Sequence, residues 1–131
     1  MNSPDLLRTE LAVRDLLTRY ARLCDQRAVD AWAELFHPDA RLQIRGVEFR
    51  GPAIRQWLVD QSSNPAGCHA TMNVTVDCTG VDTAGAVADF VFVRRQAGTG
   101  PWEIVNVGRY DDKLLRTDGQ WRFIERFITL H

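Results

Sequence analysis

Apolar residues in the first fifth of the chain recur at spacings of three, four or seven positions, which is the period of one face of an α-helix. Pro4 suits the first turn of a helix, because proline lacks an amide hydrogen and its φ angle is fixed. Ser3 can cap this turn, and Asp5 makes it acidic. We therefore expect a helix from about Pro4 to Asp25, with an apolar stripe formed by Leu6, Val13, Leu17, Tyr20 and Cys24.

A second, shorter helix is expected after a corner at residues 26–30. Val29, Trp32 and Phe36 lie three and four positions apart and define its buried face. His37 and Pro38 end it, because a residue that precedes proline is biased out of the α-helical region. His37 is then an exposed residue at a helix end and a weak candidate for catalysis.

From Ala40 onward, polar and apolar residues alternate, which is typical of a β-strand. A short strand, a turn at Gly46 and a short return strand are expected before Gly51 and Pro52 open a third helix. A cluster of Ser, Asn, Pro and Gly residues at 62–67 predicts a loop after that helix. One side of the third helix carries Ile54, Trp57, Leu58 and Gln61.

Four long segments rich in Val, Ile, Phe, Thr and Trp fill the rest of the chain and are expected to be strands. Short turn signals separate them, and consecutive strands with short turns make an antiparallel meander. The sequence thus predicts an α+β fold, in which three helices pack on a strongly bent antiparallel sheet that forms a cone. The four segments are His69 to Cys78, Ala84 to Gln96, Trp102 to Arg116 and Trp121 to Leu130.

The Asp118-Gly119 turn predicts the register of the last two strands, because a type I′ turn needs positive φ at both central positions. In this register Tyr110 and Arg126 lie on opposite faces of the sheet, so only one of them can face the cone. We favour Tyr110, because a buried phenol is easier to satisfy than a buried guanidinium. The predicted pairs are Arg116–Trp121, Lys113–Ile124, Asp111–Arg126 and Tyr110–Phe127.

Length and composition indicate an ordinary globular domain, with 131 residues of which 45% are hydrophobic and 25% charged. We expect a single domain over residues 1–131. The net charge is −1 and the basic residues are spread along the chain, so neither nucleic acid nor a membrane surface is an expected partner. Without a signal segment or a run of about 20 apolar residues, a cytoplasmic location is expected.

No metal or cofactor is expected. Cys24, Cys68 and Cys78 are odd in number and lack the C-x-x-C spacing of metal sites, so we interpret them as reduced and structural. The glycine-containing GVDTAG and GTG segments are hairpin turns rather than phosphate-binding loops. Tyr20, Asp25 and His69 would be too few ligands for a zinc site.

Asp25 and His69 are the main candidates for chemistry. Asp25 falls in the last turn of the first helix, where the helix dipole disfavours a carboxylate, so it is either solvated or held for a reason. His69 starts the first long strand, and lies either in solvent or at the open end of the cone, where ligands bind. Both positions are near a chain reversal, so the two side chains could meet.

Four segments of the chain together carry a resemblance to known proteins: YARLCDQRAVDAWAELFHPDA, GPAI, CHATMN and GRYDDKLLRTDGQWRFIERF. They resemble the SnoaL-like branch of the nuclear transport factor 2-like superfamily, and the resemblance extends from about Leu6 to Ile128. It implies a cystatin-like α+β barrel. Scytalone dehydratases, bile-acid 7α-dehydratases and hexachlorocyclohexane dehydrochlorinases of this superfamily carry an Asp and a His that match Asp25 and His69, and the bile-acid enzymes carry a Tyr that matches Tyr20.

The chain departs from these relatives in two ways. Many of them have two adjacent histidines where this chain has Cys68-His69, and the second catalytic His of scytalone dehydratase has no match here. An elimination reaction that uses one Asp and one His needs neither the adjacent histidine nor the second catalytic histidine.

The resemblance, which includes ketosteroid isomerases, implies a cofactor-independent lyase or isomerase that acts on a hydrophobic, oxygenated small molecule such as a steroid or polyketide. In this hypothesis His69 is the base, Asp25 fixes its tautomer, and Tyr20 donates to the developing oxyanion or the departing hydroxide. One alternative is a SnoaL-type polyketide cyclase. Another is a non-catalytic small-molecule-binding or assembly module, because fold does not imply function.

Several apolar side chains are candidates for the substrate pocket: Trp32, Phe36, Trp57, Met72 and Tyr110. For the first four of them, a place in the core is the more common role. Another set forms apolar stripes on the strands, and helices can cover only one face of the sheet. Such stripes need a cover, which favours a homodimer or higher homo-oligomer, as the resemblance also implies. This set is Val87, Val91, Val93, Val105, Val107, Ile124 and Ile128.

Overall fold

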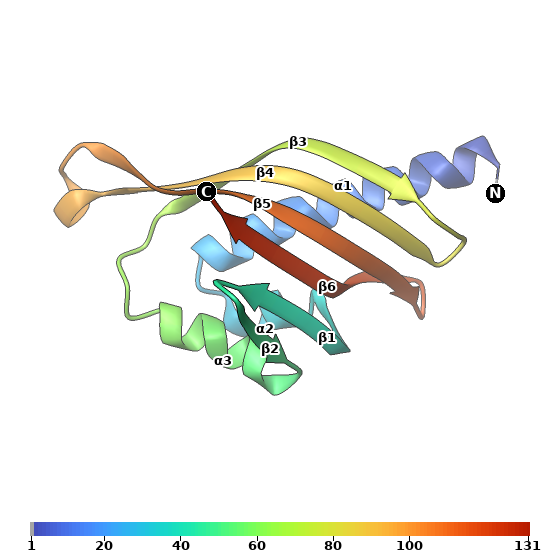
Figure 1. The fold of residues 1–131 in the computed structure, drawn as a ribbon, viewed down its shortest axis with the longest axis horizontal. Helices are drawn as coiled ribbons and strands as arrows, with labels where there is room; N and C mark the ends of the chain where they lie inside the picture. Colours follow the sequence, from blue (N-terminus) through green and yellow to red (C-terminus); the bar gives the residue numbers. More distant parts are fainter. Residues whose placement is uncertain (1) are drawn as a thin grey trace.

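The computed structural model describes residues 2–131, which form three α-helices and one six-stranded sheet. The long helix α1 lies behind the long strands, and the two short helices lie beside the first two strands (Figure 1). The α+β architecture predicted from the sequence is confirmed. Its elements are α1 (Ser3–Asp25), α2 (Val29–Ala33), β1 (Phe36–Ile44), β2 (Val47–Arg50), α3 (Pro52–Gln61), β3 (Cys68–Cys78), β4 (Thr83–Arg95), β5 (Trp102–Thr117) and β6 (Gln120–Leu130), with a 3₁₀ turn at Gln96–Gly98.

The first and third helices lie where the sequence predicts them, and the second is shorter. Asn2, and not Ser3, caps α1, with its side chain accepting a hydrogen bond from the Asp5 amide at 3.0 Å. Phe36 was expected in α2 but belongs to β1, where it pairs with Phe123 of β6. Pairing with a distant strand overrides the helical spacing here, and it makes His37 a half-buried strand residue rather than an exposed helix end.

The four long strands match their predicted ranges to within one residue at each end. The sheet has the order β2-β1-β6-β5-β4-β3. It is mixed and not purely antiparallel as predicted, because β1 runs parallel to β6 while every other neighbouring pair is antiparallel. A parallel partner cannot be joined by a tight turn, so no local turn signal announces this pair.

The β5–β6 hairpin follows the predicted register only near its turn. Arg116 pairs with Trp121 as predicted, and the same register continues to Leu114 and Phe123. A bulge at Ile124 then shifts the register by one residue, so the other three predicted pairs are wrong. Beyond the bulge the pairs are Lys113–Glu125, Asp112–Arg126, Asp111–Phe127 and Tyr110–Ile128.

The bulge brings Arg126 and Tyr110 to the same inner face, contrary to the prediction that only one of them could lie there. Both are buried, and the guanidinium carbon of Arg126 lies 3.5 Å from the centre of the Tyr110 ring and 4.0 Å from that of Tyr20. Arg126 Nε lies 3.0 Å from Oδ1 of the equally buried Asp112. Oδ2 of Asp112 and the two Nη atoms of Arg126 have no hydrogen-bond partner among residues 2–131, so this core pair is held mainly by charge and by aromatic rings.

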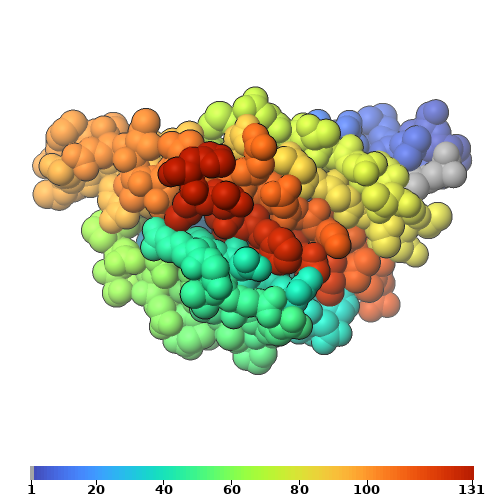
Figure 2. Space-filling view, viewed as in Figure 1, coloured from blue at the N-terminus to red at the C-terminus, as the bar shows by residue number. Residues whose placement is uncertain are grey.

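The outer face of the sheet carries exposed apolar side chains. Trp102 and Ile104 are 61% and 68% exposed, near the tip of the β4–β5 hairpin that projects beyond the rest of the molecule (Figures 1 and 2). Val87 and Val107 extend this face, whereas Ile128, which was expected there, is buried on the inner face beyond the bulge. No helix among residues 2–131 is long and apolar enough to cross a membrane.

We predict that a second copy of the chain covers this outer face, because the helices occupy the other one. Multi-angle light scattering at micromolar concentration should then return about twice the 14.9 kDa chain mass. Replacing Val107 by lysine should shift the protein toward monomer, since it places an unpaired charge in the contact. A wild-type monomer at these concentrations would contradict the prediction.

Candidate active site

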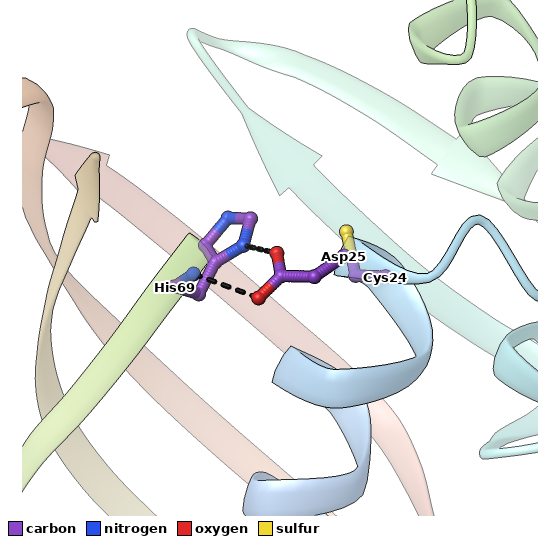
Figure 3. A group of neighbouring side chains, drawn as sticks. All are labelled: Cys24, Asp25 and His69. Carbon is purple, nitrogen blue, oxygen red and sulfur yellow. Dashed lines mark hydrogen bonds and ion pairs between the residues drawn. The ribbon is translucent and has the colours of Figure 1, made fainter. Parts of the chain in front are cut away.

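Asp25 and His69 lie in direct contact where the end of α1 meets the start of β3 (Figure 3). Oδ1 of Asp25 is 2.5 Å from Nδ1 of His69, and Oδ2 accepts a hydrogen bond from the His69 backbone amide at 2.8 Å. The side chains are only 18% and 17% exposed. The two hydrogen bonds orient the carboxylate and offset its unfavourable place at the negative end of the helix.

This contact determines which nitrogen of His69 is free to act. A carboxylate can only accept hydrogen bonds, so the hydrogen of the neutral imidazole is held on Nδ1. The lone pair is then on Nε2, which Asp25 does not touch. His69 therefore has the tautomer that a general base needs.

Aromatic packing holds the ring of His69 from one side. The ring centres of His69 and Phe92 are 4.4 Å apart. The chain enters β3 through Gly67, where a Cβ atom would lie 2.4 Å from the Val93 carbonyl oxygen and 2.6 Å from the Phe92 ring. Only glycine fits there without displacing the support of the histidine.

A cavity of about 500 Å³ begins at this pair and runs between the sheet and α3. Trp57 and Tyr110 line it, as expected for pocket walls, and so does Tyr20. Other apolar walls come from β1, β2, β4, β5 and β6. They are Ile44, Val47, Phe49, Phe90, Phe92, Val105, Ile128 and Leu130. Val105 was expected in the outer apolar stripe, but it lines the cavity at a register shift between β4 and β5.

Three of the predicted pocket residues do not line this cavity. Trp32 is fully buried behind the wall, where it stacks on Trp57 with ring centres 5.7 Å apart. Phe36 packs in the core against Phe123. Met72 is partly exposed and lies on the opposite face of β3 from His69, because successive residues of a strand alternate between faces.

Tyr20 is buried, and it lines the same cavity as the acid–histidine pair. Burial raises the pKa of its hydroxyl well above the ordinary value, although the nearby Arg126 cation lowers it. Burial also raises the pKa of the Tyr110 hydroxyl. Both phenols are therefore neutral and able to donate a hydrogen bond at physiological pH.

Cys24 completes a group of three possible metal ligands with Asp25 and His69, whose donor atoms lie within 4.8 Å of one another. Burial raises the pKa of the Cys24 thiol to about 12, and the thiolate is the form that binds metals. Both oxygens of Asp25 are already bonded to His69. The donor set is thus better suited to acid–base chemistry, and the expected absence of a metal stays a prediction.

Sequence reasoning missed several lining residues. Phe90, Phe92 and Arg94 alternate along β4 and line the cavity together, so their period of two was a signal that could have found them. Arg27 and Arg45 also line the cavity, and both have positive φ angles at chain reversals. No pattern in the sequence marks these two arginines.

Comparison with known proteins matches residues 5–126 of the chain to the SnoaL-like domain. The uncharacterized protein Rv2910c of Mycobacterium tuberculosis is 34% identical over 129 residues, which cover 91% of this chain and 83% of the relative. Because that relative is uncharacterized, the match does not indicate what reaction the site performs.

Solved structures agree with this family. An NTF2-like protein with a cystatin-like fold from Novosphingobium aromaticivorans is 27% identical, with a TM-score of 0.86 over 95% of this chain and 83% of that one. A candidate scytalone dehydratase from the same species is 20% identical, with a TM-score of 0.87 over 99% of this chain and 89% of that one. Because the matched family domain spans nearly all of the chain, the protein belongs to the SnoaL-like domain family and has its NTF2-like, cystatin-like fold.

Proposed function

We propose that the protein is a cofactor-independent lyase or isomerase in which His69 removes a proton next to a carbonyl group of a hydrophobic, oxygenated small molecule. The observation that carries the proposal is the contact of Asp25 with Nδ1 of His69 at the wall of a cavity that has both apolar and polar walls. This contact leaves the Nε2 atom of His69 free to act as the base. A pocket of this size can hold a ring compound of several fused or linked rings.

The reaction begins with transfer of the substrate proton to Nε2, which makes His69 an imidazolium ion. The Asp25 carboxylate stabilises this cation through the hydrogen bond to Nδ1. The electron pair of the broken C–H bond moves into an enolate, to whose oxygen a neutral tyrosine can donate. We assign this role to Tyr20, which lies on the helix that carries Asp25 and lines the same cavity.

From the enolate, loss of a β-hydroxyl group with return of a proton gives net elimination of water, and reprotonation at another carbon gives isomerisation. Elimination is favoured by the likeness in fold to the candidate scytalone dehydratase, whose name describes loss of water. Both outcomes share the first step, so that step is the one to test.

The test is exchange of α-hydrogens for deuterium in heavy water, followed by NMR, with a panel of cyclic ketones, steroid enones and β-hydroxy ketones. The protein should accelerate exchange for some members, and His69→Gln should abolish the acceleration. His37→Gln is the matched control, since His37 lies on β1 and does not line the cavity. Exchange that survives in His69→Gln would contradict the proposed base, and a panel that binds without any exchange or conversion would favour a binding module instead.

A further inference from the structure

Three arginines from three separate segments line the candidate cavity. Arg27 lies in the corner between α1 and α2, Arg45 in the turn between β1 and β2, and Arg94 near the end of β4. The φ angles of Arg27 and Arg45 are 57° and 53°, so both occupy tight reversals of the chain. Distant parts of the sequence thus bring guanidinium groups to one pocket.

These arginines have no acidic partner among residues 2–131, whereas most of the other arginines form ion pairs. Arg94 is the strongest case. Its Nε is buried without a hydrogen-bond partner, although its guanidinium lies 5.5 Å from the centre of the Phe92 ring. Glu103 lies opposite Arg94 in the ladder and makes no ion pair with it. A buried donor without a partner is costly, so a ligand that accepts its hydrogen bonds would be bound favourably.

The acids that line the same cavity form no ion pair with these arginines, within residues 2–131. They are Asp25, whose two oxygens are bonded to His69, and Asp60, which accepts a hydrogen bond from Gln56 at 2.8 Å. The cavity therefore has three guanidinium groups against two carboxylates, which is an excess of one positive charge. Its other walls are partly apolar and partly amide side chains.

The position of Arg94 relative to the base gives the spacing of the ligand's groups. Phe92 packs on the ring of His69, and Arg94 follows on the same face of β4, about 6.6 Å further along the strand. A ligand that reaches both His69 and Arg94 must then be about one or two rings long.

We propose that the substrate of the Asp25–His69 reaction is an apolar ring compound with a carboxylate group, which Arg94 binds with the help of Arg27 and Arg45. A guanidinium group matches the planar carboxylate with two parallel hydrogen bonds. This inference rests on the proposed function for the reaction, but it concerns recognition and can be tested without turnover.

The test compares two probes of the same shape, 2-naphthylacetate and the neutral 2-naphthylacetamide, by isothermal titration calorimetry. Wild-type protein should bind the acid about tenfold more tightly than the amide, which is the usual gain from a charge-assisted hydrogen bond. Arg94→Gln should lower the affinity for the acid to that for the amide, without weakening the amide. Arg45→Gln, at an exposed turn where the fold is not at risk, should lower the affinity for the acid in the same direction.

Arg22→Gln is the matched control, because it removes the same charge from the exposed surface of α1 and should leave the affinities for both probes unchanged. Equal affinities of the wild-type protein for acid and amide, or no binding of the acid, would overturn the proposal. So would a loss of acid affinity in Arg22→Gln as large as that in Arg94→Gln. The deuterium-exchange test is independent of this one, since an active protein could bind both probes equally and an inactive one could still prefer the acid.

Discussion

Asp25→Asn should lower kcat by about 10²- to 10⁴-fold with little change in fold. The asparagine oxygen can still accept a hydrogen bond from the His69 backbone amide. Its NH₂ group, however, would face Nδ1 and can only donate to it, so the imidazole hydrogen would move to Nε2. His69 would then present a hydrogen, and not a lone pair, to the substrate.

Steady-state kinetics on a substrate found by the exchange panel would measure this loss, and circular dichroism with thermal unfolding would check the fold. Asp15→Asn is the matched control, because Asp15 is an exposed acid of the same helix that pairs with Arg19 at 2.7 Å. It should keep full activity. Undiminished turnover by a folded Asp25→Asn protein would show that the carboxylate is not needed.

Arg126→Met should destabilise the fold by about 3 to 5 kcal/mol, because it leaves the Asp112 carboxylate alone in the interior. Arg126 and Asp112 are both fully buried. The double variant Arg126→Met/Asp112→Leu should recover most of this loss, since it removes both charges and keeps apolar volume. Arg109→Met is the matched control, because it breaks an ion pair with Asp89 at the surface and should cost about 1 kcal/mol or less.

The cost of Arg126→Met should also depend on pH. Burial raises the pKa of Asp112 to about 6, although Arg126 lowers it. The folded protein thus keeps this proton longer than the unfolded chain does, and the stability that the neutral acid provides is lost as the pH rises from about 4 to about 6. Without Arg126 the pKa of Asp112 is higher still, so the loss of stability continues above pH 6.

Urea unfolding at several pH values would measure this effect. The difference in the free energy of unfolding between wild type and Arg126→Met should be small near pH 4, where Asp112 is neutral in both, and should grow toward pH 8. A difference that is constant across this range would mean that the cost comes from lost packing around the aromatic rings and not from the stranded carboxylate.

Local patterns in the sequence were sufficient for most of the architecture. The start and end of α1, the start of α3 and all four long strands follow from periodicity, proline and glycine positions and turn signals. These features depend on neighbours in the chain, so a single sequence contains the information. Asp25 and His69 were candidates for the same reason, each being a reactive side chain at the end of a regular element.

The errors share a different origin, because each depends on contacts between distant parts of the chain. The place of Phe36 in β1 needs the parallel pairing with β6. The neighbourhood of Arg126 needs a bulge that the alternation of β6 does not reveal. Arg27 and Arg45 lie at chain reversals whose orientation is set by the whole fold, so their spacing in the sequence does not indicate a pocket.

The bulge at Ile124 has a consequence for the comparison of related sequences. Before the bulge the inward-facing residues of β6 have odd numbers, as Phe123 does, and after it they have even numbers, as Arg126 and Ile128 do. One extra residue therefore determines which side chains of β6 point into the interior. An alignment with a relative that lacks the bulge, if it places the gap a few residues further on, would exchange inward and outward side chains between the two positions, including Arg126. Reliable transfer of pocket residues between relatives therefore requires that the bulge be aligned first, and the residues on either side of it only afterwards.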